Sequence, residues 1–201
     1  MPGLRERKKQ ATRLAIHTAA LRLFAERGFA GTTVDAIAAE ADVSRATVFA
    51  YFPSKEDIVF GEAPQAVAAL AAALATSEGV DDALDAVRDW LRRLDGWLEP
   101  DLALQLRLAR EVPTVGARRL RLFAEVERVI AAALARLDEP GDAFAARLAA
   151  AAIVAALRVA EETAAARMAA DGRALSADEI DALLDTATAF ARAGMTVARA
   201  R

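Results

Sequence analysis

Residues 32–52 read TTVDAIAAEADVSRATVFAYF and hold two short helix patterns separated by a tight turn. Thr32 or Thr33 can cap the first helix, because a threonine hydroxyl accepts hydrogen bonds from the N–H groups at a helix start. Ser44 can cap the second helix in the same way, and Pro53 ends it. Two short helices joined by such a turn predict a helix-turn-helix unit, in which the second helix enters the major groove of DNA.

The apolar spacing gives these two helices a buried side and an exposed side. Val34 and Ile37 hold the first helix on a core, and Val48 holds the second from behind. Other side chains of this unit could reach base edges and phosphates. They lie at the two helix starts, on the exposed side of the second helix, or beyond its C-terminal end. These candidate DNA-binding residues are Thr33, Ser44, Arg45, Ala46, Thr47, Phe49, Ala50, Tyr51 and Lys55.

The segments on either side of this unit also follow helical patterns. A helix is expected from about Gln10 to Arg27, with Gly28 as its C-terminal cap. Residues 1–9 are expected to precede it as a basic arm, which is either a disordered tail or an arm that contacts DNA. Later helices are expected from Ser54 with a break near Gly61 and Pro64, and then over about 66–75, 81–98, 101–111, 114–138, 142–170 and 176–198. The chain is thus predicted to hold a DNA-binding domain over residues 1–60 and a second helical domain over residues 61–201.

The residue inventory predicts an all-α protein that is not an enzyme. The chain has 54 alanines among 201 residues and only 5% aromatic residues, and alanine is the strongest helix former. It has no cysteine and one histidine, His17, which excludes disulfide scaffolds, thiolate zinc sites and clusters of histidine ligands. No nucleophile-base pair or glycine-rich phosphate loop is evident, so no cofactor and no metal are expected. For His17 we expect a partly buried, hydrogen-bonded role.

Charge and hydropathy favour a cytoplasmic protein with two unlike halves. The net charge is −3, but residues 1–60 carry nine basic and seven acidic side chains, a net of +2, which leaves −5 for the rest. The most apolar stretch, residues 148–157, is flanked by arginines and is shorter than the roughly 18 residues that a membrane span needs. We therefore expect no membrane partner.

At this point the sequence resembles the tetracycline-repressor (TetR) family of transcriptional regulators. The resemblance rests on residues 16–24 with Gly28, on TVDAIA at 33–38, on ADVS at 41–44, on Thr47 and on YFPSKE at 51–56. It implies a homodimer with an N-terminal three-helix DNA-binding domain and a C-terminal ligand-binding and dimerisation domain. The glycines, prolines and capping residues of the sequence themselves predict about nine helices. The resemblance also implies that Arg45, Ala46, Phe49 and Ala50 face bases, while Thr47, Tyr51 and Lys55 position the protein on phosphates. Asp42 departs from the family, which usually has glycine in the turn, as do Ala46 for a frequent glycine and Phe49 for a frequent tyrosine.

The second half offers candidates for a ligand pocket. Trp90 and Trp97 lie seven residues apart on one helix face, a pattern that fits either a core or a pocket wall. Polar residues within apolar helices add further candidates, because a small-molecule cavity combines apolar walls with a few charged groups. The candidate ligand-binding residues are Trp90, Trp97, Gln105, Arg107, Arg110, Phe123, Arg158 and Glu162. This half resembles mycofactocin-type regulators, some of which respond to fatty acyl-CoA, which implies acyl-CoA or another amphiphile as effector.

The last two helices are the expected dimer interface. Ile180, Leu184 and Phe190 mark an apolar stripe on the last helix, and the helix before it carries small alanine side chains that permit close packing. Taken together, the residues and the resemblance predict a ligand-responsive regulator, a repressor released from a pseudo-palindromic operator in double-stranded DNA by a small effector. The alternative is an all-helical lipid or cofactor carrier that does not bind DNA.

Overall fold

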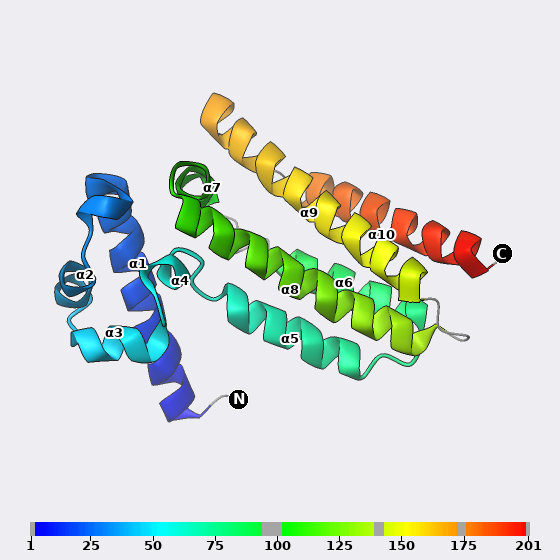
Figure 1. The fold of residues 1–201 in the computed structure, drawn as a ribbon, viewed down its shortest axis with the longest axis horizontal. Coiled ribbons are helices and arrows are strands. Elements are labelled where there is room, and N and C mark those ends of the chain that lie inside the picture. Colours follow the sequence, from blue (N-terminus) through cyan, green and yellow to red (C-terminus); the bar gives the residue numbers. More distant parts are fainter. Residues whose placement is uncertain (1–2, 94–101, 139–142, 173–175, 200–201) are drawn as a thin grey trace. The chain divides into compact units, whose positions relative to one another are not determined.

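The computed structural model describes residues 3–93, 102–138, 143–172 and 176–199, and these residues form ten α-helices and no strand (Figure 1). The all-α prediction is therefore confirmed. The chain divides into two compact units, one made of Met1–Glu62 with Leu104–Arg119 and the other of Ala63–Ala103 with Leu120–Arg201. The first break lies close to the boundary expected at residue 60. However, residues 104–119, which were expected in the second domain, belong to the first unit.

The first unit is built from five helices and the start of a sixth. They are α1 (Leu4–Gly31), α2 (Val34–Glu40), α3 (Arg45–Tyr51), α4 (Lys55–Val59), most of α7 (Leu102–Glu111) and the first turns of α8 (Pro113–Leu137). Their apolar faces meet in one core, which includes Ile16, Phe24, Ile37, Val48 and Phe52. Leu108 of α7 and Val115 of α8 complete this core, which explains why residues 104–119 pack with the N-terminal helices.

Helix α1 begins earlier than the sequence indicated. It starts at Leu4, so most of the stretch expected to be an arm before the helix is helical, and Arg5, Arg7, Lys8 and Lys9 are exposed on its first turns. Gly28, the expected C-terminal cap, adopts a φ of 73° that interrupts the helix, and a further helical turn then continues to Gly31. The Thr32 hydroxyl then donates hydrogen bonds to the carbonyl oxygens of Leu23 and Gly28, at 3.1 Å and 2.8 Å, and fixes the exit of the chain.

The helix expected from Ser54 is divided in two. Helix α4 ends at Val59, and Gly61 then adopts a φ of 48°. The ring of His17 lies over Gly61 so closely that a Cβ there would be 2.9 Å from ring atoms, and Nδ1 of His17 is 2.7 Å from the carbonyl oxygen of Ile58. Only glycine fits this position, and His17 has the hydrogen-bonded role expected of it.

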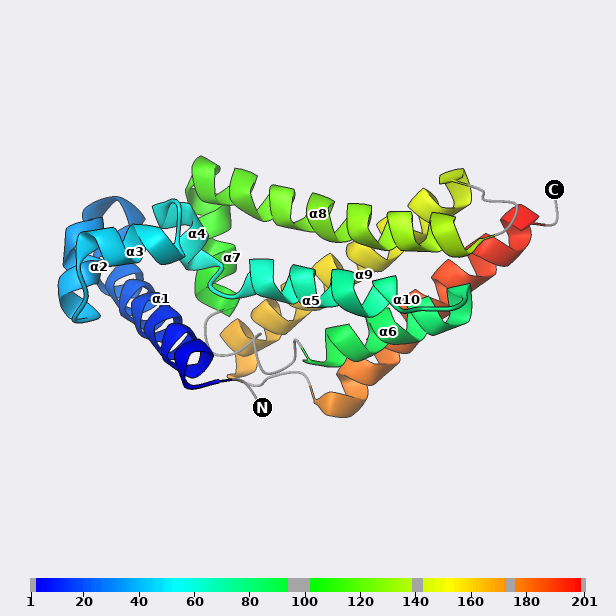
Figure 2. The ribbon, with the colours of Figure 1, turned by 90° about the horizontal axis from the view of Figure 1, so that it is seen from below.

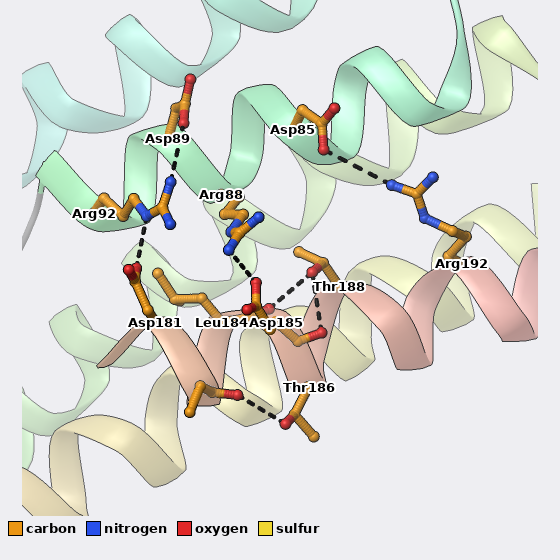
Figure 3. Close-up of polar contacts among 11 residues, drawn as sticks. Asp85, Arg88, Asp89, Arg92, Asp181, Leu184, Asp185, Thr186, Thr188 and Arg192 are labelled. Atoms are coloured by element: carbon orange, nitrogen blue, oxygen red, sulfur yellow. Dashed lines mark hydrogen bonds and ion pairs between the residues drawn. The ribbon is translucent and has the colours of Figure 1, made fainter. Parts of the chain in front are cut away.

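The second unit is formed by α5 (Ala63–Ala75), α6 (Val80–Arg93), the rest of α8, α9 (Ala143–Asp171) and α10 (Ala177–Arg199). Its core includes Leu70, Leu84, Ile130 and Ile153. Helices α9 and α10 run antiparallel along most of their length, as Figures 1 and 2 both show. A row of ion pairs joins α10 to α6: Figure 3 shows Arg92 with Asp181, Arg88 with Asp185, and Arg192 with Asp85. Arg192 also pairs with Asp81.

Helix α9 is apolar enough to need a correction to the sequence analysis. By length and composition it could cross a membrane, with a mean hydropathy of 1.8 over its most apolar window. The uncharged runs of the sequence did not indicate this window, because a few charged residues lie within the helix. Core helices also have this composition, and α9 contributes Ala146, Ala150 and Ile153 to the core of the second unit.

Candidate nucleic-acid interface

The starts of α2 and α3 are capped as the sequence predicted. The Thr33 hydroxyl accepts a hydrogen bond from the N–H of Ala36 at 3.1 Å, and the Ser44 hydroxyl accepts one from the N–H of Thr47 at 3.0 Å. Each cap satisfies a backbone group that would otherwise be unpaired at the helix start. The two side chains are therefore used to fix where the helices begin.

The turn between α2 and α3 is closed by two backbone hydrogen bonds. The N–H of Val43 donates to the carbonyl oxygen of Ala38 at 2.9 Å, and the N–H of Asp42 donates to that of Ala39 at 3.3 Å. This is the Schellman pattern, which needs a left-handed residue just after the helix. Asp42 takes that role with a φ of 53°, in the place where the sequence comparison with the family expects glycine. The fold thus tolerates the departure, since aspartate enters this region more readily than most residues.

One side of α3 is exposed and carries the four residues assigned to bases. Arg45, Ala46, Phe49 and Ala50 are all exposed, whereas Val48 on the opposite side is completely buried. Phe49 is 42% exposed, so part of its side chain is available at this surface. Thr47 and Tyr51 lie at the edges of this face and are partly buried. The structure therefore brings these residues onto one surface, although their DNA contacts stay predictions.

Arg45 is oriented by two neighbours. Its Nη1 donates to Oδ2 of Asp35 on α2 at 2.6 Å. Its guanidinium carbon is also 5.5 Å from the centroid of the Phe49 ring, one turn further along α3. The sequence analysis did not single out Asp35, because nothing in the local pattern shows that a residue on α2 will meet the start of α3.

Arg13 is a second residue that sequence reasoning missed as part of this site. It donates to the carbonyl oxygens of Tyr51 at 2.9 Å and Gly61 at 3.3 Å, and its guanidinium carbon is 4.5 Å from the Phe52 ring centroid. Burial lowers the pKa of Arg13 below its usual value, although nearby Glu62 and Tyr51 oppose that change. Arg13 thus holds the C-terminal end of α3 against α1, where a cation is favourable at a helix C-terminus.

Lys55, assigned to phosphate contact, is held by the protein itself. Its Nζ donates to the carbonyl oxygens of Phe29 at 2.6 Å and Thr32 at 2.9 Å, and it is 4.1 Å from the Phe29 ring centroid. Burial lowers the pKa of Lys55, and Glu56 partly offsets this effect. A phosphate contact by Lys55 stays a prediction, in which the ammonium group must share its protons between carbonyls and phosphate.

These contacts predict a stability effect of Lys55 that is independent of DNA. Lys55→Met should lower the free energy of unfolding by about 1–2 kcal/mol, because two carbonyl oxygens lose a charged donor. The measurement is urea unfolding followed by circular dichroism. Lys9→Met is the matched control, since Lys9 is exposed on the first turns of α1. Equal stability of the two variants would contradict the bracing role of Lys55.

Helix α4 is tied to α8 by a largely buried ion pair. Oδ1 of Asp57 accepts a hydrogen bond from Nε of Arg118 at 2.5 Å, and the two side chains are only 16% and 17% exposed. The Ser54 hydroxyl donates to the Asp57 carboxylate and accepts from the Asp57 N–H, and the Ser54 backbone N–H also donates to this carboxylate, so the two residues form a capping box. Burial alone would raise the pKa of Asp57, but the hydrogen bonds from Ser54 and Arg118 and the charge of Arg118 outweigh it and leave this pKa below its ordinary value.

The candidate ligand-binding residues are distributed over both units. Trp90 is buried, and its indole N–H donates to the carbonyl oxygen of Ala66 at 2.8 Å, so the core alternative describes it better than a pocket wall. Phe123 and Arg158 are brought together, with the guanidinium carbon 5.9 Å from the ring centroid. Glu162 lines an open depression on α9. Gln105, Arg107 and Arg110 lie on α7 in the first unit, and Trp97 lies outside the described residues.

Known proteins resemble the chain in both sequence and fold. Residues 16–61 match the family of bacterial regulatory proteins named tetR. The transcriptional regulator TcmR of Streptomyces glaucescens is 35% identical over 144 residues, which cover 65% of this chain and 64% of TcmR. MftR of Mycobacterium tuberculosis, named for regulation of mycofactocin biosynthesis, is 29% identical over 133 residues, or 65% of this chain and 67% of MftR. The chain thus spans a little under two thirds of the length of TcmR.

Solved structures extend the resemblance to nearly the whole chain. A TetR-family regulator from Mesorhizobium loti covers 90% of this chain with a TM-score of 0.60, at 21% identity and over 95% of its own chain. FadR of Thermus thermophilus, a TetR-family repressor solved with lauroyl-CoA, covers 91% of this chain with a TM-score of 0.51, at 28% identity and over 94% of its own chain. The matched residues, the curated relatives and the shared fold agree: residues 16–61 match the tetR family of bacterial regulatory proteins, and the chain as a whole is similar to regulators of that family.

Proposed function

We propose that this protein is a ligand-responsive transcriptional regulator of the cytoplasm, and most simply a repressor, that binds double-stranded DNA as a homodimer. The single observation that supports DNA binding best is the exposed face of α3. A capped seven-residue helix presents Arg45, Ala46, Phe49 and Ala50 to solvent while its other side is held by the core. A major groove admits one helix of this kind.

The chemistry of this face suits base edges. An arginine at the first position of α3 can donate two hydrogen bonds to the O6 and N7 atoms of guanine. The exposed Phe49 ring and the Ala46 and Ala50 methyl groups can pack on thymine methyl groups. Thr47 and Tyr51 at the edges of the face carry hydroxyl groups that can donate to phosphate oxygens.

The exposed apolar residues of α9 and α10 support dimerisation through these helices. In the isolated chain Phe144 is 75% exposed and Phe190 is 70% exposed, although most large apolar side chains of the second unit are buried. The exposed large apolar residues of the two helices are Phe144, Leu148, Val159, Phe190 and Val197. A two-fold axis through this face would cover the same residues on both copies. Leu184 of the expected stripe, and Met195 on the same helix, are buried in the core of the second unit.

The effector is proposed to be a small amphiphile, with acyl-CoA as the leading class. Support comes from FadR of Thermus thermophilus, a repressor of similar fold that was solved with lauroyl-CoA. The Asp57–Arg118 ion pair offers a connection to the DNA-binding helices, because α4 follows α3 after three residues and Arg118 belongs to α8. A ligand with different affinities for two positions of α8 would shift α4 and, with it, α3.

In vitro selection from a randomised duplex pool, followed by fluorescence anisotropy, tests this function. We expect the protein to select a pseudo-palindromic sequence, and its affinity to fall with salt by a slope of about 0.9 for each phosphate contact. Arg45→Ala should change the preferred base at one position of each half-site, whereas Thr47→Ala should weaken binding to all duplexes by a similar factor. Tight binding of an amphiphile without any duplex selection would instead indicate the alternative, a helical carrier.

A further inference from the structure

We infer that Asp35 is the positioning residue that sets the direction in which Arg45 reads DNA, and thereby fixes the base preference of α3. The inference rests on the proposed DNA-binding function. It concerns a residue of α2 that the base-facing set does not include. Asp35 acts through Arg45 and needs no DNA contact of its own.

The geometry holds the Arg45 guanidinium from two sides. Oδ2 of Asp35 accepts a hydrogen bond from Nη1 at 2.6 Å, and the Phe49 ring lies 5.5 Å from the guanidinium carbon. The Asp35 carboxylate belongs to α2 and the Phe49 ring to α3. Because these contacts come from different helices, together they restrict both the position and the rotation of the guanidinium plane. The other nitrogens of the guanidinium stay available, because its planar fork has five N–H donors.

The backbone fixes Asp35 as firmly as it fixes Arg45. Asp35 lies in the first turn of α2, two residues after the Thr33 cap, where the helix dipole favours a carboxylate. Arg45 is the first residue of α3, directly after the Ser44 cap. The closed turn at Asp42 and Val43 sets the distance between these two capped helix starts. The ion pair therefore joins two points that the fold already holds in register.

This ion pair matters for recognition more than for folding. Both side chains are more than half exposed, and exposed pairs of this kind contribute little to stability. Upon DNA binding, however, a guanidinium that is already oriented loses less conformational freedom when it meets a guanine. The Asp35 carboxylate also repels phosphates, so the pair gives up general affinity in exchange for discrimination between bases.

The test compares two variants that each remove one negative charge from the helix-turn-helix unit. Asp35→Asn releases Arg45, whereas Asp42→Asn removes a carboxylate from the adjoining turn and keeps a residue that tolerates a positive φ. The duplex selected by the unchanged protein and its single-base variants are the probes, and dissociation constants are measured at one salt concentration. We expect Asp42→Asn to lower the dissociation constants of all the duplexes by one common factor. We expect Asp35→Asn to reduce discrimination at the base pair read by Arg45 by about ten-fold.

A third variant isolates the path through Arg45. In an Arg45→Ala background, Asp35→Asn should leave the remaining base preferences unchanged, because the residue that it positions is gone. If Asp35→Asn instead changes the dissociation constants of all the duplexes by the same factor as Asp42→Asn does, Asp35 contributes only its charge and the inference is wrong. If the unchanged protein selects no duplex, the proposed function fails first and the inference fails with it. The two failures are therefore distinguishable.

Discussion

We expect Phe190→Glu to convert the dimer into a monomer and to weaken binding to a pseudo-palindromic duplex by about a hundred-fold or more. Phe190 is a large apolar side chain that is 70% exposed on α10. In an isologous interface the substitution places one carboxylate from each copy in the contact surface, and each would lose water without gaining a partner. A monomer reads one half-site only, so the gain from binding two linked half-sites is lost.

The oligomeric state is measured by sedimentation velocity, and DNA affinity by fluorescence anisotropy. Leu120→Glu is the matched control, since Leu120 is a similarly exposed apolar residue that lies on α8 and outside the α9/α10 face. It should remain dimeric. If Phe190→Glu also remains dimeric, the two copies meet through another surface, and the assignment of α9 and α10 as the interface is wrong.

Asp57→Ala should give the largest loss of stability among the polar substitutions proposed for the first unit, about 2–3 kcal/mol in the free energy of unfolding. The substitution removes the carboxylate that accepts from Arg118 and leaves a guanidinium that is only 17% exposed without its acidic partner. It also removes half of the capping box at the start of α4. Urea unfolding measures the loss, and Glu26→Ala, which breaks an exposed pair with Arg22, should cost only a few tenths of a kcal/mol.

The same carboxylate gives the stability a defined pH dependence. Because the pKa of Asp57 is lower in the folded protein than in the unfolded chain, its contribution is complete above the unfolded pKa of about 4. The contribution is lost as the pH falls through the folded value. The unchanged protein should therefore lose more stability between pH 5 and pH 3 than Asp57→Ala does. Parallel pH profiles for the two proteins would contradict this assignment.

Local rules were enough to predict the helix starts. The hydroxyl groups of Thr33, Ser44 and Ser54 cap the helices that follow them, because a cap depends only on the residue and the next three N–H groups. Ser176 and Glu179 form a capping box at the start of α10 by the same local rule. The exposed front of α3 was also predictable, since the helical period fixes which residues lie opposite Val48.

Contacts between distant residues were not predictable from these rules. Arg118 is 61 residues from Asp57, and Lys55 binds carbonyl oxygens 23 and 26 residues earlier. A backbone carbonyl is present at every residue, so no side-chain pattern shows which one a lysine or arginine will meet. For the same reason no local pattern indicated that Arg13, inside the helix expected from Gln10 to Arg27, holds the end of α3.

The ion pairs between α6 and α10 (Figure 3) set the longitudinal register of a helix that alanine alone would leave poorly defined. Alanine-rich surfaces are smooth, so one helix turn of sliding would change their packing very little. One turn of sliding would break the present pairs. Movement in one direction would bring Asp185 close to Asp85, two like charges, and movement in the other would take Asp185 from Arg88 to the level of Arg92. The ion pairs therefore favour one position of α10 along α6. This position determines where the exposed side chains of α10 lie on the proposed dimer interface.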